Sequence, residues 1–583
     1  MHSSGRRCGA KTPHAAHRSL TLAARLVPLL LLGLLALTGS AAFAAQIKLS
    51  TPAKDGEKIS DVYTLVAKAE SPDGIDKVEF RVDDQLRFTD TSTPYEFEWD
   101  TLADTEGPHK VTITAYDSNG ATKRLALTLV IANELDLGAE ALAQKAQDAL
   151  RAKEDETAAR YARRALKVDP ANLSANRVQA SLYAQKGEWD KAIAALEKAK
   201  IPDSDTETMQ QLASYRMQRA LLPENAANFA TDLQAVVELR RKVDDIAVNK
   251  AMEKNKAATE NSQTRAQAHE DIGDRLMEAG RYSEAIQEYK QCGQEILSTP
   301  ADCVNRLALA YVLTNQMREA RLQIEALTRE KRDTPATHAI WGLLLLRTRQ
   351  FREARDAVQP DIAAHYPGAL IIAAFADTVL RKREQGAEEA KEAARLLPDA
   401  ADAQYALAAT SLDLRESERA LHRALALNPY QSGPILDYAA RQFVLKNITQ
   451  ERIDQLLNVV NYVLKRDPDN VNAKLMQVML YLQANRVNDA EPILAALLQQ
   501  ENTALDLLFA GSVYSRYKEN FGQITRFLEA INRLSPETYY DVTNLSKPQQ
   551  AIAYFDLKRR YRADPFLTVT TLFAPKSEAT SAP

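Results

Sequence analysis

The feature that most constrains the fold of this chain is a regular spacing of small residues that recurs along most of its length. In the clearest copies, Ala308 is followed twelve residues later by Ala320, and Gly342 and Ala354 repeat that pair one period further on. The same interval of twelve separates other small residues, with Val478 and Ala490 as a looser match: Ala146 and Ala158, Ala180 and Ala192, Gly273 and Ala285, Ala374 and Gly386, Ala408 and Ala420. Antiparallel helices approach closely only where their side chains are small. The period therefore predicts an array of helical hairpins.

Two copies carry a fuller pattern of small and large residues. They comprise Ala180, Tyr183, Gly187, Ala192, Leu196 and Ala199 in one, and Ile272, Gly273, Leu276, Gly280, Ala285 and Tyr289 in the other. A period of about 34 residues with this pattern resembles the tetratricopeptide repeat (TPR). The resemblance implies an all-α superhelical solenoid, whose first helices line a concave groove that takes up an extended or helical peptide.

By this resemblance, the outward positions of the first helices would form a partner-binding groove. These positions are Asn305, Leu309, Val312, Leu313, Ala339, Leu343, Leu346, Arg347, Leu475, Met479 and Leu482. The same face of the preceding unit is acidic, with Gln267, Glu270, Asp274 and Glu278. Such a groove suits a partner with a basic and a hydrophobic portion. The alternative is a tight superhelix that buries the same leucines against its own neighbours.

Residues 1–44 are predicted to be a signal peptide. Five basic residues, Arg6 to Arg25, precede the apolar run Leu26 to Leu37 and the small-residue signal Ala42-Phe43-Ala44. Cleavage after Ala44 would export the protein to the periplasm or the cell exterior, whereas an uncleaved leader would be a membrane anchor. No later apolar run is long enough to span a bilayer. Loss of the leader makes the net charge more negative than −4, which argues against a nucleic-acid partner.

From residue 46 to 134 the periodicity changes from 3.6 to 2, which is typical of strands. Alternating segments such as Val78 to Val82 and Tyr95 to Trp99 are separated by turn residues, which predicts a β-sandwich. The stretch from Val78 to Thr122 closely resembles bacterial Ig-like domains of exported proteins. Such domains are spacers or docking modules. We expect a core around Phe80, Phe97 and Trp99, and no metal, because Asp73, Asp76, Asp83 and Asp84 lie where turns favour Asp.

The remaining domain plan follows from where the repeat is strong. We predict a first TPR lobe at 137–222, a long-helix insertion or break at 223–265, and a second TPR lobe at 266–536. Residues 537–583 are predicted to hold a C-terminal helix, Gln549 to Arg562, and a disordered tail, with Phe566 to Phe573 either forming a strand or trailing. This organisation makes the chain a multidomain protein, an Ig-like sandwich followed by a solenoid.

Cys292 and Cys303 form a candidate disulfide. Cys8 would leave with the leader, and the remaining pair would lie in an oxidising compartment at neighbouring helix ends. Two buried free thiols are the alternative.

Motifs for catalysis are absent from the sequence. It contains no HExxH, CxxC, GxSxG, Walker or GxGxxG pattern, and the histidines beyond the leader are scattered singly. We therefore predict no enzyme activity, no cofactor and no metal. The resulting hypothesis is an exported scaffold that binds protein segments in the cell envelope, similar to repeat proteins of secretion or exopolysaccharide-export assemblies. The alternative is a glycan- or cell-wall-binding protein whose Ig-like domain binds while the array is a spacer.

Overall fold

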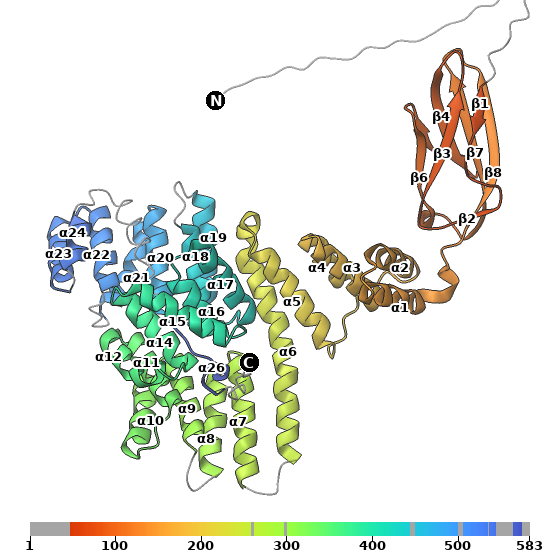
Figure 1. Cartoon of the computed structure of the whole chain (residues 1–583). Helices are drawn as coiled ribbons and strands as arrows, with labels where there is room; N and C mark the ends of the chain where they lie inside the picture. Colours follow the sequence, from red (N-terminus) through yellow and green to blue (C-terminus); the bar gives the residue numbers. More distant parts are fainter. Residues whose placement is uncertain are drawn as a thin grey trace, which may run out of the picture. The chain divides into compact units, whose positions relative to one another are not determined.

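The structure, a computed structural model, describes residues 47–257, 262–295, 300–443, 449–499, 505–534, 536–543 and 564–573. The chain divides into two compact units, residues 1–131 and 132–583. In the described part, the first is all-β and the second is helical (Figure 1). This confirms the predicted fold class. The expected signal peptide, the helix at 549–562 and the tail from 574 lie outside the described residues.

The first unit is a sandwich of two sheets. The three-stranded sheet has the order β1 (Lys48–Ser50), β3 (Val62–Glu70), β6 (Tyr95–Asp100). The five-stranded sheet has the order β2 (Glu57–Ile59), β8 (Thr122–Ile131), β7 (Gly107–Asp117), β4 (Ile75–Val82), β5 (Gln85–Asp90). A short 3-10 helix, η1 (Thr101–Ala103), follows β6.

Alternation along the strands fills the space between the sheets. In β6, Tyr95, Phe97 and Trp99 are buried while the two glutamates between them are exposed. The rings of Phe80 and Phe97 lie 5.8 Å apart, and the indole N–H of Trp99 donates to Asp104 Oδ2 at 2.8 Å. The sandwich therefore has the predicted aromatic core.

The second unit is built of helical hairpins. The first helices are α1 (Gly138–Arg151), α3 (Leu173–Gln185), α5 (Thr206–Ala220), α7 (Ser262–Glu278), α9 (Ala301–Leu313), α11 (Pro335–Arg347), α14 (Pro367–Val379), α16 (Ala401–Thr410), α18 (Ser432–Phe443), α20 (Val471–Gln483) and α22 (Leu505–Tyr517). The second helices are α2 (Asp155–Val168), α4 (Trp189–Lys198), α6 (Phe229–Ala257), α8 (Tyr282–Glu295), α10 (Met317–Arg329), α12 (Phe351–Ala357), α15 (Arg383–Leu396), α17 (Leu414–Leu427), α19 (Gln450–Arg466), α21 (Val487–Gln499) and α23 (Phe521–Leu534). Shorter pieces are η2 (Leu135–Leu137), η3 (Pro223–Asn228), α13 (Gln359–Ile362), α24 (Pro536–Thr543) and α26 (Val569–Phe573).

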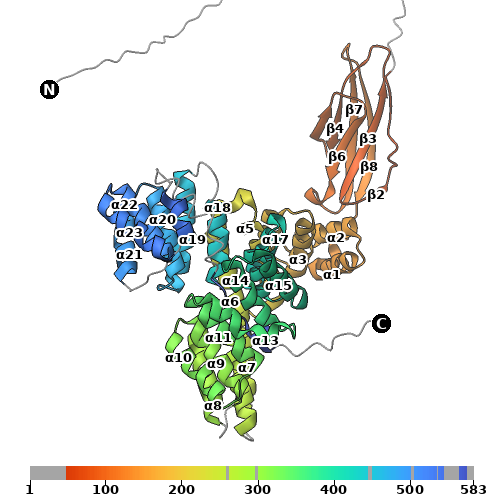
Figure 2. The ribbon, with the colours of Figure 1, turned by 60° about the vertical axis from the view of Figure 1, so that its left-hand side comes forward.

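The small residues of the repeat lie where helices cross. A Cβ added to Gly273 would lie 2.3 Å from Cε1 of Tyr289 on α8, and one added to Gly342 would lie 3.2 Å from Cγ1 of Val358 at the end of α12. Ala308 of α9 and Ala320 of α10 are fully buried. The spacing of twelve residues therefore marks the contact between the two helices of a hairpin, and hairpins α7–α8 and α9–α10 lie side by side in both views (Figures 1 and 2).

Helix α6 occupies the stretch where the repeat loses register. The sequence left open whether this stretch is a long helix inserted in the array or a break that divides the array into two lobes. In the structure α6 packs against α5, α7 and α19, and its apolar face is covered. Phe229 stacks on Tyr438 with ring centroids 4.2 Å apart, and Asp244 accepts a hydrogen bond from the hydroxyl of Tyr430 at 2.5 Å. Helix α6 is thus tied to α18, far along the chain.

Candidate functional site

The inner surface of the array is formed by first helices that pack directly on one another. Helix α11 contacts both α9 and α14, and α14 contacts α16. Residues 564–573, which we call the C-terminal segment, lie on this surface. The helical end of the segment, α26, contacts α7, α11 and α14, and it lies among these helices in Figure 1. The array therefore holds a piece of its own chain as a groove would hold a peptide.

Apolar side chains anchor the C-terminal segment. Phe566 and Leu567 are 1% and 0% exposed, and Val569 and Leu572 are also buried. The ring of Phe566 stacks on Tyr405 of α16, with centroids 5.9 Å apart and planes 23° apart. These side chains belong to the main apolar cluster of the array.

Arg347 holds the beginning of the segment. Its Nε donates to the carbonyl of Pro565 at 3.2 Å, and its Nη2 lies 3.4 Å from Oδ1 of Asp564. Its Nη1 donates to the carbonyl of Val312 at 3.2 Å, which fixes the guanidinium at the end of α11. One arginine thus recognises both a backbone carbonyl and a carboxylate of the segment.

Asp402 holds the middle of the segment. Its Oδ2 accepts from the backbone N–H of Thr568 and its Oδ1 from the hydroxyl of Thr571, both at 2.7 Å. Burial raises the pKa of Asp402, and the hydrogen bonds from the two threonines lower it in part. Further on, the hydroxyl of Tyr366 donates to the carbonyl of Leu572 at 2.9 Å. Asp402 and Tyr366 therefore bind backbone and hydroxyl groups of the segment through direct hydrogen bonds.

A buried ionic group meets the end of the segment. Arg306 forms ion pairs with Glu270 at 3.2 Å and with Asp274 at 2.8 Å, and its guanidinium lies 3.9 Å from the ring centroid of Phe573. Burial raises the pKa of Glu270, which the charge of Arg306 partly offsets. The acidic face that the sequence indicated in this unit is thus partly neutralised by an arginine of the next unit, which pairs with two of its three carboxylates.

Two glycines leave room for the segment. A Cβ on Gly433 would lie 2.5 Å from the backbone oxygen of Asp564, and one on Gly368 would lie 3.0 Å from Cδ2 of Leu572. Neither glycine has a positive φ, so their role is space rather than backbone freedom.

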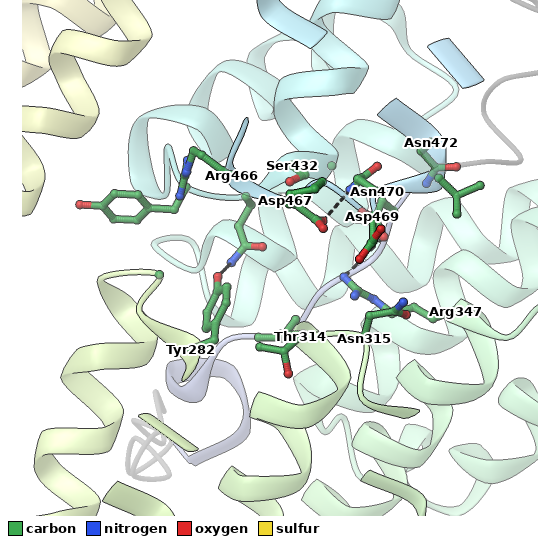
Figure 3. A pocket seen from close by; sticks show the side chains of 18 of the residues that line it. Tyr282, Thr314, Asn315, Arg347, Ser432, Arg466, Asp467, Asp469, Asn470 and Asn472 are labelled. Atoms are coloured by element: carbon green, nitrogen blue, oxygen red, sulfur yellow. Dashed lines mark hydrogen bonds and ion pairs between the residues drawn. The ribbon is translucent and has the colours of Figure 1, made fainter. Parts of the chain in front are cut away.

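An open cavity of about 930 Å³ adjoins the beginning of the segment (Figure 3). Its walls come from helix ends and turns of several hairpins and include Leu313, Leu346 and Arg347, and Asp564 and Pro565 complete the lining. Across the cavity, the amide of Gln431 donates to the hydroxyl of Tyr282 at 2.5 Å. The cavity leaves part of the surface next to the segment uncovered.

The structure brings only part of the predicted groove together. Leu313, Leu346 and Arg347 line the cavity. The outward orientation expected for the other predicted groove residues is wrong, because they are at most 2% exposed: Asn305, Leu309, Val312, Ala339, Leu343, Leu475, Met479 and Leu482. Asn305 instead donates to Thr334 Oγ1 at 3.1 Å, and Leu475 and Met479 belong to a separate apolar cluster. The superhelix is tight enough to bury these leucines against neighbouring helices.

Sequence reasoning missed the residues that hold the segment most firmly. Tyr366, Asp402 and Tyr405 are not outward positions of the repeat pattern, and the segment itself was expected to form a strand or to trail. The signal available in the sequence was the apolar run Pro565-Phe566-Leu567 close to the chain end.

The two cysteines are free thiols, so the expected disulfide is absent from the structure. Cys292 and Cys303 are buried beside Ala266. The Cys303 thiol donates to the carbonyl of Tyr289 at 3.4 Å, and hydrogen bonding with Cys292 and burial raise its pKa. The described residues therefore contain the alternative arrangement, a pair of adjacent buried thiols.

Comparison with known protein families supports the fold of the first unit. A family model described as a bacterial Ig domain matches residues 46–113. A solved structure of fibronectin(III)-like modules of Clostridium thermocellum CbhA is 25% identical, with a TM-score of 0.14. The match covers 15% of this chain and about half, 47%, of that one. No curated protein matches the chain.

Two solved helical structures also resemble the chain. The Cut9–Hcn1 hetero-tetramer is 12% identical over 70% of this chain and 96% of that one, with a TM-score of 0.35. A tetratricopeptide repeat protein from Parabacteroides merdae is 12% identical over 44% of this chain and 99% of that one, with a TM-score of 0.28. At such scores these likenesses add nothing to the geometry described above. Within the described residues, no helix has both the length and the apolar character required to cross a bilayer.

Proposed function

We propose that this protein is an exported, non-enzymatic scaffold that binds protein segments on the inner surface of its helical array. One observation carries the proposal: residues 564–573 already occupy that surface, with Phe566 against Tyr405 and the backbone held by Arg347, Tyr366 and Asp402. A surface that binds carbonyls, an amide and side chains of one short segment has the chemistry required to bind another.

Export is supported by the sequence of residues 1–44 and by the bacterial Ig domain that follows it. In this proposal the Ig-like domain is a spacer or docking module, and the array acts in the cell envelope. A secretion or exopolysaccharide-export assembly is the finer version. Sequencing the N-terminus of the protein purified from its own cells tests export, and the expected first residue is Ala45.

The glycan-binding alternative would need exposed aromatic side chains in a row on the sandwich. Three tyrosines of the sandwich could contribute to such a row: Tyr63, Tyr95 and Tyr116. Tyr63 packs partly buried against the core, Tyr95 is 6% exposed, and the hydroxyl of Tyr116 donates to Glu79 at 3.0 Å while its ring lies under Lys77. The rings of Tyr63 and Tyr95 thus pack on the core, and Tyr116 is covered by a lysine side chain. These arrangements favour the array as the binding part.

Site-specific photo-crosslinking tests the proposed surface. A benzophenone amino acid replaces Leu313, which lines the cavity, or, as the control, Phe521, which is 76% exposed on α23. After illumination of intact cells, we expect the probe at 313 to give a discrete adduct with a segment of another envelope protein, and the probe at 521 to give none. Equal adducts at both positions would refute the proposed surface. No adduct at either, with polysaccharide retained by the Ig-like domain, would favour the alternative.

A further inference from the structure

We infer that the C-terminal segment is a built-in ligand, and that the partner of this surface is a protein segment that carries the same groups, ends in a similar helical turn and displaces it. The groups are an acidic residue, a Pro-aromatic-aliphatic run, and a backbone N–H and a hydroxyl three residues apart. This inference rests on the proposed function and names the partner's chemistry.

Asp402, an acidic residue of the surface, accepts two of its hydrogen bonds from the segment. Outside its own helix, the hydrogen bonds that the described residues give to Asp402 come from Thr568 and Thr571 of the segment. Asp402 is 1% exposed with the segment in place, so a ligand that took this place without either donor would leave an oxygen of a buried carboxylate unpaired. The position is therefore suited to a ligand that brings an N–H and a hydroxyl together.

The other contacts define the shape and charge of that ligand. Tyr405 offers a face for one aromatic ring. Gly433 has no side chain, which leaves room for the backbone oxygen of the ligand residue at the position of Asp564. Arg347 requires a carboxylate at the position of Asp564 and an accepting carbonyl next to it. At the far end, Arg306 offers a cation over a second aromatic ring. The partner is thus acidic at its start and apolar after it, and does not need the basic portion that the sequence suggested.

The segment is placed so that a competitor can replace it. The first helices contact each other directly, so the segment lies on the inner layer of the array rather than between its hairpins. The half-buried Leu313 lines the cavity beside Asp564 and Pro565, so a ligand can reach it next to the beginning of the segment. A partner segment can bind there first and then take over the sites of Phe566 and Thr568 in turn.

Connection to the chain favours the built-in ligand over a free one. Twenty residues separate Thr543, the end of α24, from Asp564. Because the segment is covalently attached to the array, its binding is intramolecular, so a partner must bind tightly or through more than one contact to displace it. The surface is accordingly closed to weak, incidental peptides.

A fluorescent peptide with the sequence of residues 563–574 tests the inference by anisotropy. We expect it to bind a chain that ends at Thr543, and to bind the full chain at least about tenfold more weakly, because the full chain carries its own copy. In the shortened chain, Asp402→Ala should weaken binding at least about tenfold, the scale expected for loss of a charged hydrogen bond. The control Asp399→Ala, whose side chain is 81% exposed, should leave binding unchanged.

Peptide variants provide a matched pair. Thr571 is buried against Asp402 whereas Thr570 is exposed. The Thr571→Val peptide should bind at least about tenfold more weakly than the Thr570→Val peptide, which should bind like the unaltered one. Equal affinities of these two peptides would overturn the inference that Asp402 recognises the hydroxyl at position 571.

A second variant covers the case in which the shortened chain fails to fold. Phe566→Ala with Thr571→Val in the full chain should vacate the surface and make the full chain bind the unaltered peptide at least about tenfold more tightly. If it does not, the segment is a fixed part of the fold and the inference is wrong. It is equally wrong if light scattering shows that the segment is exchanged between two copies. An adduct at position 313 without peptide binding would overturn this inference and leave the proposed function standing.

Discussion

The contact between Arg306 and Phe573 gives a quantitative test that the segment is seated in solution. The perturbation is a double-mutant cycle, with Arg306→Met and Phe573→Leu made singly and together. The guanidinium lies 3.9 Å from the ring centroid, and the Arg306 side chain is only 8% exposed. A cation over an aromatic ring contributes about 2 kcal/mol where it is desolvated, so we expect a coupling free energy of about 2 kcal/mol. That corresponds to about a thirtyfold change in an opening equilibrium.

The cycle isolates this one contact. Arg306→Met also removes the ion pairs with Glu270 and Asp274, but their loss is common to both sides of the cycle and cancels. An exposed pair in the same array is the control: Arg486 lies 4.6 Å from the ring centroid of Tyr481 and is 43% exposed. With Arg486→Met and Tyr481→Leu we expect a coupling of only about 0.5–1 kcal/mol.

Native-state hydrogen exchange, read by mass spectrometry, supplies the opening free energies of the segment and of α20. Each pair is followed in its own element of the intact protein, which avoids assuming that a chain of this size unfolds in two states. A coupling for the Arg306 pair within about 0.5 kcal/mol of zero, the usual error of additivity, would show that Phe573 does not lie against Arg306. The seating of the segment would then be refuted.

Three further predictions concern the scaffold. The hydrogen bond to Asp83 and the Thr105 carbonyl outweigh burial and raise the pKa of His109, so its stabilisation of the sandwich should be complete below about pH 6.5 and lost as the pH rises through the raised pKa. Urea unfolding of the first unit from pH 5 to 9 should show this slope, and His109→Gln should remove it. Gly273→Ala should destabilise the array by about 1–3 kcal/mol in thermal unfolding, because its methyl group would meet an aromatic carbon at 2.3 Å. Gly522→Ala, where the nearest atom is 3.8 Å away, should instead be neutral or stabilising by up to about 1 kcal/mol. Iodoacetamide without reductant should label Cys292 and Cys303 in urea but not in the native protein, and labelling that requires reductant would reveal a disulfide.

Much of the fold could be predicted from the sequence because the residues that determine it lie close together in the chain and recur. Small residues such as Gly273 and Ala308 recur at the helix crossings of successive hairpins, so their regular spacing predicts those crossings. The alternation in β6 similarly predicted that Phe97 and Trp99 lie between the sheets. In both cases the pattern that sets burial is contained in a few adjacent residues.

The binding surface was less predictable because it depends on curvature and on distant contacts. The direction in which Leu309 and Leu343 face follows from small rotations added from hairpin to hairpin, which a single unit does not encode. Asp402 and Thr568 are 166 residues apart, and no pattern around either indicates the other. Only Arg347 among the predicted site residues holds the segment through hydrogen bonds, since it lies at a helix end beside the cavity.

The most direct measurement of the central claim is to cut the chain between the array and its C-terminal segment. A protease site inserted between residues 543 and 564 is cleaved in the folded protein, and the products are separated by gel filtration at micromolar concentration. We predict that the fragment carrying residues 564–583 elutes with the array and exchanges with an added labelled copy, whereas the Phe566→Ala fragment elutes alone. Immediate separation of the unaltered fragment from an intact array would contradict the account.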